Sequence, residues 1–246
     1  MSKFYTNIYS IVNLYKKMSS KSEVVTQMIY GDSFQIIKKN SKWLKIKIKE
    51  DSYIGFIKKI KFVNFLKPTH KISVLSSDTF GAANKERKLG KLTYGSKIKV
   101  TIKNSKFSKF QNRWIENKNI KPYNYKSKNI FLDIGMFNNI KYKWGGKSFK
   151  GIDCSALVQI FFNYNNKFCP RDAKDQVKYF KNDIKLKEIK KNDVIFWKGH
   201  VAIALSKKKL IHAYGPAKKT LVMDVEKTIK LIQKTAKLKV FLVKRI

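Results

Sequence analysis

The spacing of hydrophobic and polar positions changes along the chain, and the clearest helical pattern begins near residue 154. After Ser155, the run Ala156–Tyr164 is apolar on nearly every side, which predicts a buried helix rather than an amphipathic surface helix. Three short apolar segments follow, separated by Lys-rich or Gly-containing turns: Asp193–Trp197, His200–Leu205 and Leu210–Ala213. Short apolar runs between turn signals predict the strands of an antiparallel meander.

The part of the chain before residue 125 follows a two-residue period and predicts only strands. Strict alternation in Leu44–Lys49 would turn the apolar side chains inward and the lysines outward. A second, weaker set of strands runs from Lys67 to about Tyr125. We therefore predict an α+β chain with three domains, at residues 1–66, 67–124 and 125–246, of which the first two are small and all-β.

One cysteine, Cys154, stands where the predicted buried helix begins. The first backbone N–H groups of a helix have no internal partner, and their partial positive charge lowers the pKa of a thiol placed there. We therefore expect the Cys154 thiol to be ionised near neutral pH and to act as a nucleophile. A small buried thiol is the commoner state of a cysteine taken alone, so the assignment depends on a neighbouring base.

Two of the three histidines, His200 and His212, lie in the strands predicted after this cysteine. If the connection at 206–208 has three residues, Ala202 lies opposite His212, and His200 shares that face of the sheet. A two-residue hairpin without a bulge would turn the two rings to opposite faces, so we predict an odd connection or a bulge. His200 is then the general base, and His212 holds its imidazole in the useful tautomer.

Two histidines in one region also allow a metal site. Zinc sites usually need three or four protein ligands, and the chain contains no CxxC, HxxxH or HExxH spacing. We therefore rank catalysis well above metal binding and expect no cofactor. His70 lies far away between lysine-bearing segments and is expected to be a solvated loop residue.

Five short motifs occur in one order over about the last 120 residues: Tyr142–Gly146, Asp153–Ser155, Asp193–Phe196, His200–Ile203 and His212–Ala213. Together they resemble the NlpC-type cell-wall cysteine peptidases, which have a papain-like fold with a helix packed on an antiparallel sheet. The resemblance implies a triad of Cys154, His200 and His212. It also implies that the Tyr142 hydroxyl and the backbone N–H of Cys154 form an oxyanion hole.

The other motif residues leave alternatives open. Tyr142 and Trp144 could also be core aromatics. The segment Cys169–Gln176 is similar to the Pro-Arg-Asp segment of this family, and we place it at the rim of the cleft without a chemical role. Because a Cys154–Cys169 disulfide would destroy the nucleophile, the two thiols favour a reducing compartment.

The strands before residue 125 resemble bacterial SH3-like barrels. Tyr30 and Gly31 match the turn before the second strand and Trp43 opens the third, whereas the family's usual Trp after the late Gly is Phe56 here. Two such barrels ahead of an NlpC-type domain resemble the γ-D-glutamyl-L-diamino acid endopeptidases. In that group the first barrel closes one end of the cleft, so that the substrate must begin with a free amino group.

This resemblance implies contacts to the substrate amine from both parts of the chain. Asp153 and Ser155, on either side of the nucleophile, take the roles of the family's amine-binding acid and serine. From the barrel we expect Tyr53, with a carboxylate from Glu23 or Asp32. Asp153 and Ser155 are also ordinary residues for a helix start, and Tyr53 could be a packing residue.

The resemblance therefore predicts a hydrolase of the thiol protease type. Its expected substrate is the γ-D-Glu to diamino acid bond of murein (peptidoglycan) peptides with a free N-terminal L-Ala, in recycling or turnover of the cell wall. Three alternatives stay open: a lytic enzyme acting on intact wall, an amidase or acyltransferase on the same scaffold, and a non-catalytic polyanion-binding protein.

The formal charge of +39 comes almost entirely from lysine, since only four of the 55 basic residues are arginines. The lysines are spread along the whole chain and do not form a stripe. We therefore predict no specific nucleic-acid partner, although polyanions should bind in a salt-dependent way and acidic peptides should be attracted.

The N-terminal sequence shows no export signal. The first twenty residues lack a continuous apolar core and a small-residue cleavage site, and no stretch approaches the roughly 20 apolar residues of a membrane span. A cytoplasmic monomer is the simplest expectation, with export by another route left open.

Overall fold

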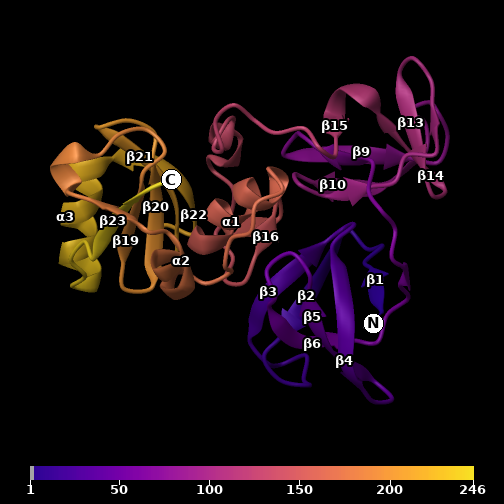
Figure 1. The fold of residues 1–246 in the computed structure, drawn as a ribbon, viewed down its shortest axis with the longest axis horizontal. Helices are drawn as coiled ribbons and strands as arrows, with labels where there is room; N and C mark the ends of the chain where they lie inside the picture. The colour runs from indigo at the N-terminus through magenta and orange to yellow at the C-terminus, as the bar shows by residue number, and fades with distance from the viewer. Residues whose placement is uncertain (1–2) are drawn as a thin grey trace. The chain divides into compact units, whose positions relative to one another are not determined.

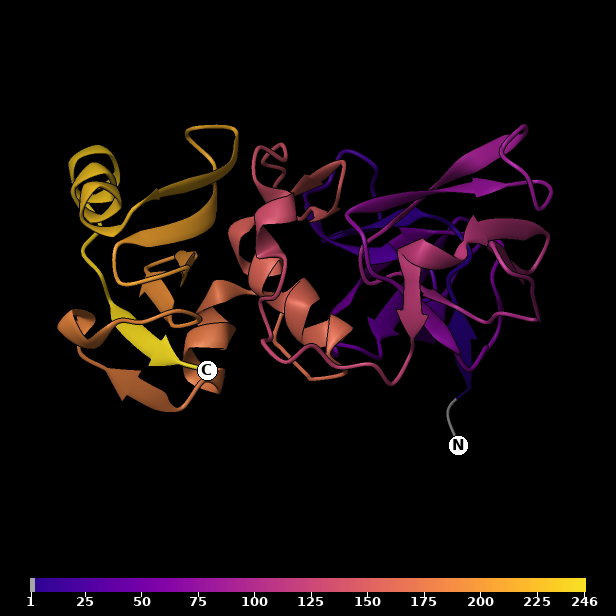
Figure 2. The same ribbon diagram turned by 90° about the horizontal axis from the view of Figure 1, so that it is seen from above.

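The computed structural model describes residues 3–246, and the chain divides into two compact units. The first unit holds the chain up to Lys126 together with two short later segments, Lys147–Phe149 and Asn163–Lys167. The second unit holds residues 127–146, 150–162 and 168–246. Figures 1 and 2 show the ribbon from two sides, with the N-terminal strands in indigo and the C-terminal helix in yellow.

The N-terminal part of the first unit is a seven-stranded antiparallel sheet. Along the sheet the strands follow the order β3-β2-β6-β5-β4-β1-β7. Their bounds are β1 Phe4–Thr6, β2 Ile11–Tyr15, β3 Val24–Ile29, β4 Ser33–Lys39, β5 Trp43–Ile48, β6 Ile54–Lys58 and β7 Val63–Asn64. The alternation predicted for β5 is confirmed, because Leu44, Ile46 and Ile48 are buried in one core while Lys47 is exposed.

The next part of the first unit holds a five-stranded and a three-stranded sheet, in the orders β10-β9-β14-β13-β12 and β11-β8-β15. The bounds are β8 His70–Ile72, β9 Ser76–Phe80, β10 Lys88–Thr93, β11 Lys97–Ile98, β12 Ile102–Lys103, β13 Phe107–Phe110, β14 Arg113–Glu116, the 3-10 turn η1 Asn117–Asn119 and β15 Ile120–Pro122. His70 lies at the start of β8 and is half-buried, so the prediction of a solvated loop residue is wrong.

A turn of the seven-stranded sheet enters the core of the following strands. Tyr30 is 3% exposed and packs with Ile72, Leu92 and Phe110, which belong to β8, β10 and β13. Gly31 must be glycine here, since its φ is +84° and a Cβ would stand 2.0 Å from the carbonyl oxygen of Lys97. Residues up to Lys126 are therefore packed as one unit, and their division into 1–66 and 67–124 stays a prediction.

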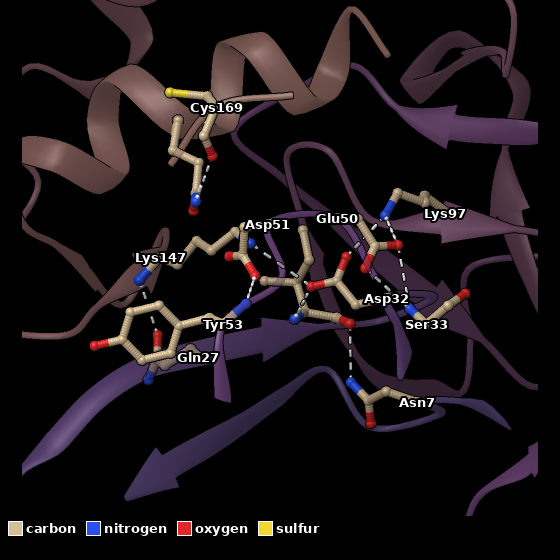
Figure 3. Close-up of polar contacts among 12 residues, drawn as sticks. Asn7, Gln27, Asp32, Ser33, Glu50, Asp51, Tyr53, Lys97, Lys147 and Cys169 are labelled. Carbon is tan, nitrogen blue, oxygen red and sulfur yellow. Dashed lines mark hydrogen bonds and ion pairs between the residues drawn. The ribbon is translucent and has the colours of Figure 1, made fainter. Parts of the chain in front are cut away.

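A buried network of charges lies next to this turn (Figure 3). The Lys97 ammonium is 2.9 Å from a carboxylate oxygen of Asp32 and 2.6 Å from one of Glu50. Burial opposes these charges, but Lys97 and Lys147 still lower the pKa of Asp32. Asp32 is thus committed to lysine partners inside the first unit, which argues against its use as a free carboxylate for a substrate.

Two segments from later in the sequence complete the first unit. In β16 (Lys147–Ser148) the backbone N–H of Lys147 donates to Gln27 at 3.0 Å, and the Lys147 ammonium lies 3.8 Å from Asp32 (Figure 3). In the other segment, the Tyr164 ring stacks on Tyr94 at 4.4 Å between centroids, and the buried Lys71 ammonium donates to the Tyr164 carbonyl.

The second unit contains three α-helices and a six-stranded antiparallel sheet. Its strand order is β18-β23-β19-β20-β21-β22. The bounds are η2 Ile134–Phe137, β17 Gly151–Ile152, α1 Cys154–Tyr164, α2 Ala173–Tyr179, β18 Asn182–Ile184, η3 Leu186–Glu188, β19 Val194–Trp197, β20 His200–Ala204, β21 Lys209–Tyr214, β22 Lys219–Asp224, α3 Val225–Ala236 and β23 Leu242–Arg245. Among residues 3–246, no helix is both long and apolar enough to cross a membrane.

The helix and the meander predicted from the apolar pattern are both present. In α1 every residue from Cys154 to Phe162 is buried, as expected for a helix that is apolar all round. Strands β19, β20 and β21 pair antiparallel in sequence order. Helix α3 lies beside this sheet (Figure 1). Its residues Val225 and Ile232 are buried in one core with side chains of the sheet.

Candidate active site

Helix α1 begins at Cys154, and Asp153 caps its N-terminus. The Oδ1 atom of Asp153 accepts a hydrogen bond from the backbone N–H of Ala156 at 2.9 Å, which satisfies one of the unpaired donors of the first turn. This capping is the purely structural role that the sequence analysis left open for Asp153. It fixes Cys154 at the first helical position, where the residue is 7% exposed.

The ionisation state expected for Cys154 is wrong for the free protein. Burial raises the pKa of the Cys154 thiol to about 12, and the negative charge of Asp153 raises it further. Backbone N–H groups of Val201 and Ser155 and the charge of Arg171 act in the opposite direction but do not overcome desolvation. The resting thiol is therefore protonated, and a base would have to remove its proton before the sulfur could act as a nucleophile.

The histidines are brought together as predicted. Ile203 pairs with Ile211 and Ala204 with Leu210, which leaves residues 206–208 as the three-residue connection expected from the sequence. Nε2 of His200 lies 2.9 Å from Nδ1 of His212, so the two imidazoles are hydrogen-bonded. His200 directly precedes Val201, whose amide faces the Cys154 sulfur.

Both imidazoles are neutral at physiological pH. Burial lowers the pKa of His200 to about 3 and that of His212 to about 4. When Nε2 of His200 donates to His212, Nδ1 of His200 is left unprotonated and able to accept a proton. The ring of His212 is fully buried and stacks on Tyr214, with 4.9 Å between centroids and 11° between planes.

A single β-bridge between Tyr142 and Ile152 holds Tyr142 close to Cys154. Tyr142 pairs with Ile152, two residues before Cys154, and its backbone N–H donates to the carbonyl of Lys218 at 2.8 Å. Burial raises the pKa of Tyr142, and the nearby Cys154 and Asp153 raise it further. The phenol therefore keeps its proton and can donate a hydrogen bond.

Two glycines shape the loop between Tyr142 and the nucleophile. Gly145 has a φ of +69°, and its N–H donates to Oδ2 of Asp153 at 2.9 Å. A Cβ on Gly146 would stand 2.5 Å from the carbonyl oxygen of Gly151 and 2.8 Å from that of Lys143. The Gly-Gly pair is thus required by the backbone contacts that hold this loop against the residues before Cys154.

Trp144, in the same loop, is 60% exposed. The interpretation of Trp144 as a core aromatic is therefore wrong.

Sequence reasoning missed the role of Arg171. This side chain is 3% exposed, and its guanidinium binds both carboxylate oxygens of Asp153, with Nη1–Oδ1 at 2.9 Å and Nη2–Oδ2 at 2.5 Å. Nη1 also donates to Oγ of Ser155 at 2.9 Å. The only local signal was an arginine in the segment assigned to the rim, and the pairing across 18 residues of sequence could not be inferred from it.

The residues expected to bind an amine are already engaged with each other. Asp153 accepts from two backbone N–H groups, from the Ser155 hydroxyl at 3.2 Å and from both Arg171 nitrogens. These five donors exceed the roughly four lone-pair positions of a carboxylate. A substrate amine would have to share a carboxylate oxygen of Asp153 with one of these donors or displace that donor.

The two barrel residues expected at the site belong to the first unit. Glu23 is exposed and its carboxylate lies 3.2 Å from the ammonium of Lys16. Tyr53 is half-buried, and its backbone N–H donates to Asp51 at 3.0 Å (Figure 3). Their role in binding a substrate stays a prediction.

The sulfur atoms and the carboxylates of the chain were candidates for a disulfide or a metal site. Cys154 and Cys169 are both buried thiols and form no disulfide. Within residues 3–246, no three His, Cys, Asp or Glu side chains gather in a way that could hold a metal ion.

A thiol at a helix start, a hydrogen-bonded histidine pair on adjacent strands and a protonated tyrosine beside the thiol are the groups that a cysteine peptidase needs in its active site. Residues 139–235 match the NlpC/P60 family, and residues 14–59 match the bacterial dipeptidyl-peptidase Sh3 domain. The chain thus contains an NlpC/P60 domain and, ahead of it, a bacterial dipeptidyl-peptidase Sh3 domain.

Similar proteins agree with these domain matches. Gamma-D-glutamyl-L-lysine dipeptidyl-peptidase of Bacillus subtilis (strain 168) is 23% identical over 231 residues, which cover 84% of this chain and 77% of that protein. Dipeptidyl-peptidase 6 of Lysinibacillus sphaericus is 38% identical over 72 residues, 29% of this chain and 27% of that protein. The crystal structure of an NlpC/P60 family protein from Bacillus cereus ATCC 10987 shares the fold, with a TM-score of 0.85 at 15% identity over 98% of this chain and 99% of that one.

Proposed function

We propose that this peptidase hydrolyses the amide bond between the γ-carboxyl of D-glutamate and a diamino acid in murein peptides that begin with a free L-alanine. The observation that carries the proposal is the hydrogen bond of 2.9 Å between His200 and His212. His200 is the residue directly before Val201, whose backbone amide faces the sulfur of Cys154. The name of the Bacillus subtilis relative, which covers most of the chain, supports the γ-D-glutamyl bond as the substrate.

The reaction starts from a neutral thiol and a neutral imidazole. Cys154 Sγ attacks the γ-carbonyl carbon while its proton passes to Nδ1 of His200, and the positive charge on that ring is stabilised by His212. His200 then gives this proton to the leaving amine as the C–N bond breaks, which leaves a thioester. Water, deprotonated by His200, attacks the thioester, releases L-Ala-γ-D-Glu and returns the proton to the thiol.

The negative charge that develops on the carbonyl oxygen needs donors in fixed positions. The hydroxyl of Tyr142 and the backbone N–H of Cys154 are the proposed donors, and such a donor contributes about 3 kcal/mol to stabilising the tetrahedral intermediate. Because the pKa of Tyr142 is raised, this hydroxyl stays protonated over the working pH range.

Recognition of the free amine is the second part of the proposal. A buried ammonium without partners is costly, so binding requires acceptors. Asp153 and Ser155 provide them on the peptidase side, within the network held by Arg171, and Tyr53 with Glu23 would provide them from the SH3-like domain. Since Asp153 already accepts five hydrogen bonds, we expect an amine to share its charge rather than to meet a free carboxylate.

The nucleophile is tested with the tripeptide L-Ala-γ-D-Glu-diaminopimelate, with products identified by mass. Cys154→Ala should abolish release of L-Ala-γ-D-Glu. Cys169→Ala, which removes the other buried thiol, should retain it. Turnover by the Cys154 variant would refute the assignment.

The amine requirement is tested by comparing the free and the N-acetylated tripeptide. We expect the acetylated peptide to be cleaved at least about a hundredfold more slowly, because its amide carries no charge for Asp153 to bind. Equal rates for the two peptides would show that the free N-terminus is not recognised.

A further inference from the structure

Arg171 is buried and is distant in sequence from both Cys154 and the two histidines. Even so, Nη1 and Nη2 of its guanidinium bind Asp153, the residue directly before Cys154. It also donates to Ser155, the residue after Cys154. One guanidinium thus holds the side chains on both sides of the nucleophile. Buried, bidentate Arg–carboxylate pairs of this kind fix geometry as well as charge.

The segment that carries Arg171 is itself anchored to α1. Gln176 donates through Nε2 to the carbonyl of Ser155 at 2.8 Å and to the carbonyl of Pro170 at 2.9 Å. Gln159 donates to the carbonyl of Cys169 at 3.1 Å. Two buried glutamines therefore fix the backbone of the two residues directly before Arg171, which leaves the guanidinium little freedom to follow a substrate.

The charge of Asp153 works against the chemistry of its neighbour. A carboxylate adjacent to Cys154 disfavours a second negative charge on the sulfur, and in a buried site this repulsion is strong. The positive charge of Arg171 acts on the sulfur in the opposite direction and offsets part of this repulsion. The charged or titratable groups that act on the sulfur are Asp153 and Arg171, with Tyr142 beside it and His200 one residue before the Val201 amide.

We propose that Arg171 is a positioning residue that neutralises Asp153 so that Cys154 can lose its proton, while Asp153 keeps its place as the cap of α1. This inference rests on the proposed function only for the identity of the nucleophile. It assigns Arg171 an electrostatic role that is independent of any substrate contact.

The test is the rate at which iodoacetamide alkylates Cys154 as a function of pH, with Cys154 and Cys169 distinguished by peptide mass mapping. Arg171→Met should slow alkylation of Cys154 about tenfold or more at a given pH, since each unit of thiol pKa is a factor of ten in thiolate. The double variant Asp153→Asn with Arg171→Met removes both charges and should return the rate to within about threefold of the parent protein.

A matched control is the Arg245–Asp193 pair of the second unit, in which the arginine is partly exposed and the aspartate is buried. Arg245 binds Asp193 through two contacts of 3.1 Å, and Asp193 is 1% exposed. Arg245→Met also leaves a buried aspartate without its arginine, but it should not change alkylation of Cys154. Circular dichroism and thermal melting show which variants are folded.

The outcomes separate charge from packing. The proposal is overturned if Cys154 of Arg171→Met is alkylated at the rate of the parent protein. It is also overturned if Cys154 of the folded double variant is alkylated as slowly as Cys154 of the folded Arg171→Met variant. Should Arg171→Met not fold, Asp153→Asn alone is compared with the double variant. In Asp153→Asn the positive charge of Arg171 is no longer balanced by the Asp153 carboxylate, so Cys154 should be alkylated faster than in the double variant, and equal rates would overturn the proposal. Because no substrate is used, failure of tripeptide cleavage leaves this result interpretable.

Discussion

The histidine pair makes the stability of the protein depend on pH in a way that can be calculated. Burial lowers the pKa of His200 to about 3 and of His212 to about 4, from the ordinary value of 6.5. The unfolded chain therefore binds protons before the folded one as the pH falls. The stabilisation from neutral, buried imidazoles is complete above about pH 6.5 and is lost as the pH falls from there toward 4.

The magnitude follows from the two pKa values. At about pH 5, the pH is about 1.5 units below the pKa of a histidine in the unfolded chain. Protonation of the unfolded chain then lowers the free energy of unfolding by about 2 kcal/mol per histidine relative to neutral pH. The pair together contributes about 4 kcal/mol, a large part of a typical stability of about 5–15 kcal/mol. His212→Gln removes one titrating group, so we expect this variant to lose only about half as much stability on acidification as the parent.

Proton NMR of the imidazole Cε1 protons measures the pKa values directly, because the chain has only three histidines. Urea unfolding at about pH 5 and 7.5 then measures the free-energy change in the parent, His212→Gln and a His70→Gln control. Burial lowers the pKa of the half-buried His70 too, but this residue lies outside the site, and its removal should leave the steep dependence of the pair in place. Resonances of His200 and His212 that titrate near 6.5, or an unchanged acid dependence in His212→Gln, would refute the reasoning.

Three further substitutions test other features. Tyr142→Phe should lower kcat for the tripeptide about a hundredfold with little change in KM, since an oxyanion donor contributes about 3 kcal/mol, and an unchanged kcat would exclude this role. Gly146→Ala should lower the melting temperature by several degrees, because its Cβ would lie 2.5 and 2.8 Å from two carbonyl oxygens, whereas Gly135→Ala, with nothing within 4 Å, should not. Lys97→Met should cost about 3–5 kcal/mol in urea unfolding, as it leaves two carboxylates without their shared ammonium. Exposed Lys91→Met should cost less than about 1 kcal/mol, and equal effects of the two lysine variants would contradict the importance of the buried network.

Features that depend on neighbouring residues in the sequence were predictable. The start of α1 follows from Asp153, whose side chain caps the first turn, and from the apolar run after it. The facing of His200 and His212 follows from the length of one connection, because a strand alternates its side chains with a period of two. In both cases a few consecutive positions contain all the necessary information.

Features that depend on packing between distant segments were not predictable. The pKa of the Cys154 thiol is set mainly by desolvation, which overrides the helix N-terminus and depends on everything packed around the sulfur. Arg171 finds Asp153 only after α1 and the segment before α2 have come together. Tyr30 has the pattern of a turn residue, and only the assembled first unit places its ring in the core of the strands that follow.

The short segments 147–149 and 163–167, before and after the buried part of α1, restrict how this chain could be recombined. In a fragment beginning after Lys126, the Lys147 ammonium would lose its contact with Asp32, and Tyr164 would lose its contacts with Tyr94 and Lys71. A chimera that joins this peptidase sequence to a foreign SH3-like half must therefore supply an anion and an aromatic surface at those two places. Evolutionary exchange of the N-terminal half is constrained by the flanks of the nucleophile helix rather than by the linker alone.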